Sequence, residues 1–299
     1  MKKALTILFV TFLSFSAFAQ KDLLAEADSL ADLDREKQFV HGTFKGTRII
    51  NGHSIETPAK QDLHFVISHR FGTINKGIYE LFGLDHATIR LGFDYGINDR
   101  LAIGTGRSSL EKTYDGYVKY KLLRQKEEAG MPISLVAFAS TAMNTLRFSE
   151  DEKERKFESR LSYTTQLLIA RKFSERLSIQ LTPTYIHRNY VNTRADENDV
   201  YAVGFAGRFK LNKRIALTGE YFYVLPGKTA DDFEDVLSFG FDIETGGHVF
   251  QVHFTNAQGM IEKFFIPQTT GRWYKKEIYF GFNISRAFTL GEKKPKKAW

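Results

Sequence analysis

The sequence predicts an all-β protein, an antiparallel transmembrane β-barrel of about 12 strands with short periplasmic turns and longer extracellular loops. Three observations predict this fold. The N-terminus has the layout of an export signal, apolar side chains occupy every second position from residue 61 onward, and short and long connections alternate. Phe (27) and Tyr (13) are abundant, yet mean hydropathy is negative (−0.30), as expected when only one face of each strand is apolar.

The first 19 residues have the three parts of a secretory signal peptide. Lys2 and Lys3 form a positive start, Ala4–Phe15 is an almost unbroken apolar run, and Ala17–Ala19 supplies the small-x-small pattern that signal peptidase reads. We therefore expect residues 1–19 to be removed and the mature chain to begin at Gln20. The apolar run is too short to span a bilayer as a helix, which disfavours the alternative of a retained anchor.

Charge and cysteine content narrow the possible partners. The chain has no cysteine, which excludes a lipid-anchored lipoprotein, disulfides and thiolate metal sites. Loss of Lys2 and Lys3 with the signal lowers the formal net charge from +7 to +5. The basic residues are spread among acidic ones rather than gathered in a run, so no nucleic-acid partner is expected.

Two segments precede the predicted barrel. Residues 20–38 are acidic and helix-prone, and they are either a short periplasmic helix or a flexible linker. Residues 39–60 are an accessory segment whose first part, 39–51, reads as strand-like. Counting it would give thirteen spanning strands, whereas bacterial single-chain barrels have an even number. We therefore expect this segment either to pair at the periplasmic rim or to enter the lumen.

The barrel is expected over residues 61–288. In 87–97, for example, Ile89, Leu91 and Phe93 alternate with Arg90 and Gly92. Such alternation fits a soluble sandwich as well, but small and charged residues mix on the non-aromatic face, as a wet lumen requires. The expected strands are 61–71, 87–97, 101–108, 114–124, 133–142, 157–172, 177–189, 199–211, 215–225, 236–244, 248–256 and 277–288.

Connection lengths predict the orientation. Short turns near 98–100, 174–176, 212–214 and 245–247 alternate with long connections such as 257–275. Short turns face the periplasm in outer-membrane barrels, and an even strand count places both ends of the barrel there.

The end of the chain and one proline give further expectations. The aromatic alternation of 277–288 resembles the closing strand that the outer-membrane assembly machinery recognises, so this machinery and the lipid bilayer are expected partners. A basic tail, 289–299, follows it. Pro183 falls inside an expected strand, where it should mark a bulge or the strand's emergence from the membrane, because proline cannot donate a ladder hydrogen bond.

Several segments resemble a family of uncharacterised Gram-negative outer-membrane β-barrel proteins. They are His69–Gly72, Phe82–Asp85, Arg90–Gly96 and Gly104–Ser109, together with Phe44–Asn51 ahead of the barrel. The resemblance covers most of the mature chain. It implies the fold and the outer-membrane location, but it supplies no catalytic or binding residue.

Three patterns invite a chemical interpretation, and none predicts a catalytic, cofactor or metal site. Gly104–Ser109 superficially resembles a phosphate-binding loop, but it lacks the third glycine and a following helix, which favours packing of small residues between strands. His64 and His253 both face the predicted lumen, but they have no third metal ligand. In a lipid hydrolase, Ser159 and His187 would be nucleophile and base. The hairpin register instead places Tyr163 opposite His187, about 13 Å along the strand from Ser159.

The predicted lumen carries a surplus of basic side chains. By alternation, nine basic and five acidic residues face it, and fixed positive charge favours anions. The candidate selectivity residues are Arg70, Arg90, Lys119, Lys121, Arg160, Arg208 and Lys210.

Three functions follow, in order of preference. The leading hypothesis is a small passive pore or solute channel with a mildly anion-favouring lumen and an unknown solute. The alternative is a structural or partner-binding barrel whose lumen is plugged by its own side chains or by residues 21–51, with a periplasmic protein as its candidate partner. An outer-membrane lipid hydrolase comes third.

Overall fold

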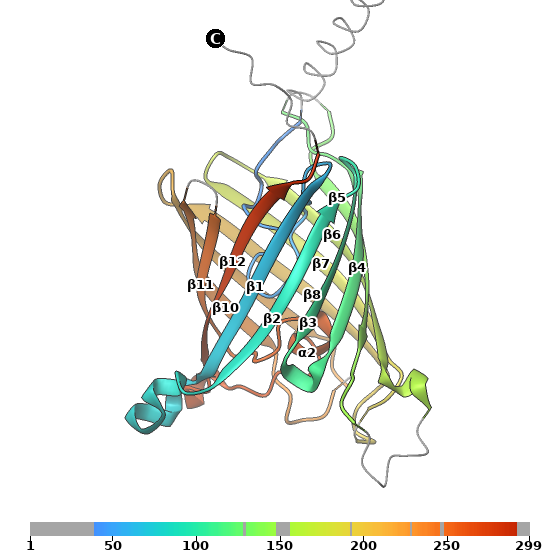
Figure 1. Cartoon of the computed structure of the whole chain (residues 1–299), viewed down its shortest axis with the longest axis vertical. Coiled ribbons are helices and arrows are strands. Elements are labelled where there is room, and N and C mark those ends of the chain that lie inside the picture. Colours follow the sequence, from blue (N-terminus) through green and yellow to red (C-terminus); the bar gives the residue numbers. More distant parts are fainter. Residues whose placement is uncertain are drawn as a thin grey trace, which may run out of the picture.

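Twelve antiparallel strands form a closed barrel in the computed structural model, which describes residues 39–127, 130–147, 156–191, 193–227, 229–245 and 248–291. Each strand pairs with its neighbours in sequence, and β1 pairs with β12 to close the sheet (Figure 1). The strands are β1 (Asp62–Thr73), β2 (Ala87–Gly96), β3 (Leu101–Ser108), β4 (Tyr114–Leu123), β5 (Ser134–Met143), β6 (Leu161–Lys172), β7 (Leu177–Arg188), β8 (Asp199–Lys210), β9 (Ile215–Val224), β10 (Val236–Thr245), β11 (His248–Thr255) and β12 (Tyr279–Thr289). The predicted fold and strand count are confirmed.

Helices are few and short. They are η1 (Ile74–Gly83), η2 (Leu110–Lys112), η4 (Phe157–Arg160), α2 (Glu262–Phe265) and η5 (Trp273–Lys275). Within the described ranges, no helix has the length and apolar composition that crossing a bilayer requires. The expected signal peptide, the acidic segment 20–38 and most of the basic tail lie outside the described residues.

The alternating sequence places apolar side chains outside and polar ones inside. On β2, Ile89, Leu91 and Phe93 are exposed on the outer surface, whereas Arg90 and Asp94 are buried in the interior. Since the sheet of the described residues closes on itself, none of its strands has a free edge. The two predicted faces are therefore correct.

The barrel has two distinct ends, here named by their connections. The turn end holds the short turns, the start of β1 and the end of β12, where Asp62 pairs with Thr289. The loop end holds the long connections and η1, and it lies at the bottom of Figure 1. Short and long connections thus segregate as their lengths predicted.

Two glycines of the predicted small-residue segment accommodate large neighbours inside the barrel. A Cβ atom at Gly104 would lie 2.3 Å from the ring of Tyr117, and one at Gly106 would lie 2.4 Å from the guanidinium of Arg90. These glycines let bulky lumen side chains lie flat against β3. The packing interpretation is confirmed in place of a phosphate loop.

Two local expectations are wrong, and one of the two alternatives for Pro183, the bulge, is excluded. Residues 39–51 form no strand, only isolated bridges such as Phe39 with Lys126, because their backbone groups bond mostly to side chains of the wall. Pro183 causes no bulge: the β6–β7 ladder is interrupted opposite it and resumes in the same register, and the strand continues to Arg188. The sixth strand begins at Leu161, because Phe157–Arg160 forms a 3₁₀ turn.

Candidate functional site

Two segments enter the barrel from opposite ends and occupy its lumen. Residues 43–56, which we call the plug, enter from the turn end, and residues 257–271, which we call the inner loop, enter from the loop end and carry α2 (Figure 1). Most side chains of both segments are buried. The segments meet inside the barrel, where Arg48 Nη1 donates to the carbonyl of Met260 at 3.2 Å and the side chains of His53 and Glu262 lie 3.8 Å apart.

The plug is a reversed turn with very little structure of its own. The amide of Ile49 donates to the carbonyl of Gly52 at 2.9 Å, and the amide of Ser54 donates to the carbonyl of Thr47 at 3.0 Å. The Ser54 hydroxyl also donates to the carbonyl of Gly46 at 2.6 Å. These bonds shape the tip at residues 49–52, but the remaining backbone groups need partners from the wall.

Glu220 on β9 holds the tip of the plug. Its carboxylate accepts hydrogen bonds from three successive backbone amides, those of Ile50 (3.3 Å), Asn51 (2.8 Å) and Gly52 (3.1 Å). Gly52 fits where a larger residue would not, since a Cβ there would lie 2.9 Å from the Phe222 ring. A single buried carboxylate thus accepts from three of the four amides of the tip.

The Asn51 side chain extends this attachment to three further strands. Its amide nitrogen lies 3.0 Å from the Ser238 hydroxyl on β10 and 3.4 Å from that of Thr255 on β11, and its oxygen accepts from Arg70 Nη2 on β1 at 2.6 Å. Arg70 was predicted to line the lumen as a selectivity candidate. In the structure it lies inside the barrel and is bonded to the plug.

Lys119 on β4 bonds to both arms of the plug, on the two sides of the tip. Its ammonium donates to the carbonyls of Thr47 (2.9 Å), Ser54 (2.9 Å) and Glu56 (3.1 Å), which uses all three of its donors. Thr47 also donates to Asp94 on β2 at 2.6 Å. Neutral side chains complete the attachment: Gln180 on β7, Gln251 on β11 and Asn283 on β12 each bond to plug backbone.

One side of the plug is apolar. Phe44, Ile49 and Ile55 join a buried cluster with the wall residues Tyr117, Val136, Phe138, Leu168, Ala170 and Ala206. The His53 ring lies 4.5 Å from the rings of both Tyr117 and Phe138. Burial, and then the nearby cations Arg48, Lys119 and Arg90, hold the pKa of His53 well below its ordinary value, so the docked ring is neutral.

The inner loop is held differently. Ala257, Phe265 and Ile266 pack into a buried cluster with the wall residues Ile186, Val200, Ala202, Phe222 and Val236. Several of its backbone bonds are local: the amide of Phe265 donates to the carbonyl of Ile261, and the amide of Gln268 donates to the carbonyl of Phe264. Burial raises the pKa of Glu262 at the start of α2.

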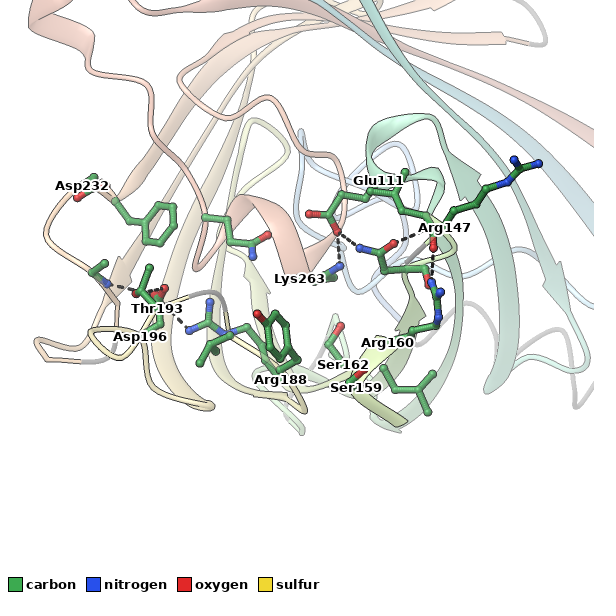
Figure 2. Close-up of a pocket in the computed structure, with 18 residues that line it drawn as sticks. Glu111, Arg147, Ser159, Arg160, Ser162, Arg188, Thr193, Asp196, Asp232 and Lys263 are labelled. Atoms are coloured by element: carbon green, nitrogen blue, oxygen red, sulfur yellow. Dashed lines mark hydrogen bonds and ion pairs between the residues drawn. The ribbon is translucent and has the colours of Figure 1, made fainter. Parts of the chain in front are cut away.

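A charged cavity of about 420 Å³ opens beside the inner loop at the loop end (Figure 2). Two ion pairs lie on its lining: Lys263 with Glu111 at 2.6 Å, and Arg188 with Asp196 at 3.6 Å. Arg160, Asp232 and Ser162 also line it. Its charged and hydroxylated surface suits a hydrated or polar solute better than an apolar one.

The seven predicted selectivity residues occupy different places. Arg70, Arg90, Lys119 and Arg208 are buried inside the barrel, where Arg90 pairs with Asp115 (2.9 Å) and Arg208 with Asp242 (3.4 Å). Lys121 and Lys210 are half-buried toward the turn end, and Lys121 lines a small cavity beside Glu56. Arg160 is not on a strand: it lies on η4 at the loop-end rim and donates to the carbonyl of Asn144.

Sequence reasoning missed the neutral residues that hold the plug and the inward path of residues 257–271. Gln180, Gln251 and Asn283 carry no charge and were not counted, although strand alternation places them on the inner face. The apolar run from Phe264 to Ile266 within a long polar connection was the available signal that this connection folds inward.

The residues of the hydrolase hypothesis are not brought together. Tyr163 lies opposite His187, as the hairpin register predicted. Ser159 Oγ donates to the carbonyl of Lys156, while His187 Nδ1 lies 2.7 Å from Asp199. Across the described part of the chain, no group of three or more His, Asp or Glu side chains could hold a metal ion.

Comparisons with known proteins place the chain in a family. No curated protein matches the sequence. Among solved structures, it is similar to the NanC porin (11% identity, 76% of this chain and 100% of that one, TM-score 0.47). It is also similar to the KdgM porin in complex with disordered oligogalacturonate (9% identity, 76% and 99%, TM-score 0.46). The family model described as membrane bound beta barrel domain (DUF5777) matches residues 44–288, a span that includes all of the plug except residue 43, and the chain therefore belongs to this family.

Proposed function

We propose that this protein is an outer-membrane channel that its own plug holds closed. The observation that carries the proposal is the way the plug is attached. Polar side chains from eight strands bond to the plug, mostly to its backbone, and water can replace each of these bonds when the plug leaves. The expected export signal supports the outer membrane as its location.

Withdrawal of the plug would leave a hydrophilic path. Glu220, Lys119, Asp94 and Gln180 would then face water instead of plug backbone, as the lumen residues of open barrels do. The surplus of basic residues on the inner face supports a mild preference for anions. The inner loop would remain and narrow this path on the side of the charged cavity.

The inner loop and the plug have separate roles in this proposal. The inner loop is the fixed constriction, because apolar packing against β7 to β10 holds it. The plug is the gate, because it lies near the N-terminal end of the described chain and its first residues leave the barrel at the turn end. A periplasmic protein could therefore reach the chain that leads into the plug.

A plugged, partner-binding barrel is the second candidate, and one contact favours it. Arg48 of the plug bonds to Met260 of the inner loop, so the segment that enters from the turn end is attached to the segment that enters from the loop end. In that case the barrel would never conduct. Its folding would still depend on the lipid bilayer and the outer-membrane assembly machinery.

Single-channel recording in planar bilayers separates these functions. Two proteins are compared: the mature chain from Gln20, and a variant that lacks residues 20–56, whose folding is checked by its heat-dependent gel mobility. At neutral pH the channel proposal expects the first to be silent and the second to conduct steadily. Steady conductance of the mature chain would contradict gating by the plug. Silence of both folded proteins would establish the plugged barrel.

A further inference from the structure

An exposed apolar hairpin projects sideways from the barrel wall at the loop end. It comprises residues 74–84, between β1 and β2, and contains η1 (Figure 1). Ile78 and Tyr79 are 75% and 91% exposed, and Leu81, Phe82 and Leu84 are each about half exposed or more. This is a larger concentration of exposed apolar side chains than a soluble loop carries.

The backbone of this hairpin holds the side chains outward. Leu81 and Phe82 have positive φ angles of 44° and 54°, a conformation that such side chains rarely adopt. At the base, Gly83 and Gly72 approach so closely that a Cβ at Gly83 would lie 2.5 Å from the Gly72 carbonyl carbon. The strained backbone and the tight base together hold the hairpin away from the barrel wall. Its apolar side chains therefore stay exposed instead of packing against the barrel.

The height of the hairpin along the barrel indicates what covers it. Its first amide, at Ile74, donates to the carbonyl of Ile278, beside the start of β12. Outward-facing aromatic rings lie near this level: Phe71 of β1 stacks on Phe280 of β12 at 5.7 Å, and Trp273 of η5 stacks on Phe239 of β10 at 5.1 Å. Trp and aromatic side chains at the edge of a membrane barrel form the girdle that sits at the lipid headgroups.

We propose that residues 74–84 are a membrane anchor that lies flat at the boundary between headgroups and acyl chains of the leaflet at the loop end. The hairpin continues the lipid-facing surface of β1 and β12 outward in the plane of that boundary. Ile78, Leu81 and Phe82 enter the acyl region, and the phenol of Tyr79 stays at the polar level. The anchor fixes the depth and tilt of the barrel on the side where the sheet closes.

Fluorescence of a single attached probe tests the anchor in the full chain. The chain has no cysteine, so Tyr79→Cys can carry an environment-sensitive dye in vesicles of phosphatidylcholine, some with nitroxide-labelled acyl chains. Phe241→Cys, midway along the outer face of β10, is the bilayer-embedded control, and Asp231→Cys on another exposed loop-end connection is the aqueous control. A second site, Ile78→Cys, guards against an effect of losing the tyrosine.

If the hairpin is a membrane anchor, we expect blue-shifted emission from the dye at positions 78 and 79. Quenching by lipid nitroxides should be several-fold stronger there than at position 231. Strong quenching by iodide from water, at the level of position 231, would overturn it. Protection from both quenchers would also overturn it and would indicate that a protein, a partner or a second copy, covers the hairpin.

Discussion

The plug and the inner loop both fill the lumen, but different forces hold them. The plug has a few internal hydrogen bonds and one apolar side, but most of its contacts with the wall are hydrogen bonds from polar side chains such as Glu220 and Lys119. The inner loop makes its own backbone bonds and buries Phe265 and Ile266 in an apolar cluster. Water competes well for the first kind of contact and poorly for the second.

This difference assigns a role to each segment. A segment that is attached mainly by hydrogen bonds to the wall exposes polar groups when it leaves, and water solvates these groups readily. A segment with an apolar core costs free energy to remove, because its apolar area would be exposed. The plug is therefore suited to move, and the inner loop to stay.

The largest expected effect is at the inner loop. Phe265→Ala should destabilise the folded barrel by about 3–5 kcal/mol, because it opens a cavity among Phe222, Ile186 and Val200. Urea unfolding in detergent measures this change. Phe44→Ala in the plug is the matched control, and a loss of global stability as large as that of Phe265→Ala would contradict the comparison.

A smaller and more local effect is expected at the plug tip. Glu220→Ala leaves three buried amides without an acceptor, which should weaken docking by about 1–3 kcal/mol. Hydrogen exchange at residues 50–52 should accelerate about ten- to a hundredfold, while exchange in α2 stays unchanged. Glu220→Gln keeps an acceptor oxygen and should change exchange less. Equal acceleration in both segments would show that they open as one unit.

Acidification should favour the undocked plug through His53. Its pKa is lowered in the docked state, so on acidification below about 6.5 the free plug binds a proton that the docked plug does not, and docking weakens by at most about 1.4 kcal/mol per pH unit. The raised pKa of Glu262 acts in the opposite direction. We expect the open probability of the mature chain to rise from pH 7.5 to about 5.5 more than that of His53→Gln. An identical pH response of the two proteins would contradict this role.

The smallest effect is on ion preference. In the variant that lacks residues 20–56, chloride should be more permeant than potassium, because the predicted lumen carries four more basic than acidic residues. Changing Lys119 and Lys121 together to Glu removes this surplus and should reduce or reverse the preference. Reversal potentials under a salt gradient measure it, and a cation-preferring parent would show that the predicted lumen charge is wrong.

The fold was predictable because strand alternation is a local property of the sequence. Neighbouring residues such as Arg90 and Leu91 indicate which face of a strand points inward and which points outward. All twelve strands and the Tyr163–His187 pairing could therefore be predicted from the alternation and the turn positions. The plug was not predictable in the same way. Its shape depends on contacts between Asn51 and residues as distant as Ser238, and no local pattern around residue 51 contains that information.

Charge counting also predicted less of the site than of the fold. It identified Arg70 and Lys119 on the inner face, where the structure has them, but it treated them as pore-lining cations. Both are engaged with the plug, Arg70 with Asn51 and Lys119 with three carbonyls. A side chain's face follows from alternation, whereas its partner depends on which segment fills the lumen.

Thiol accessibility on β8 tests most directly whether the plug alone closes the lumen. Ala202 and Ala206 lie on the same face of this strand; Ala202 is covered in the cluster of the inner loop and Ala206 in that of the plug. Each is changed to Cys in the cysteine-free chain and treated with a small charged thiol reagent, with and without residues 20–56. We expect both cysteines to be protected in the mature chain, and only Ala206→Cys to react once the plug is removed. Reaction of Ala206→Cys in the intact chain, or its continued protection without the plug, would contradict the account.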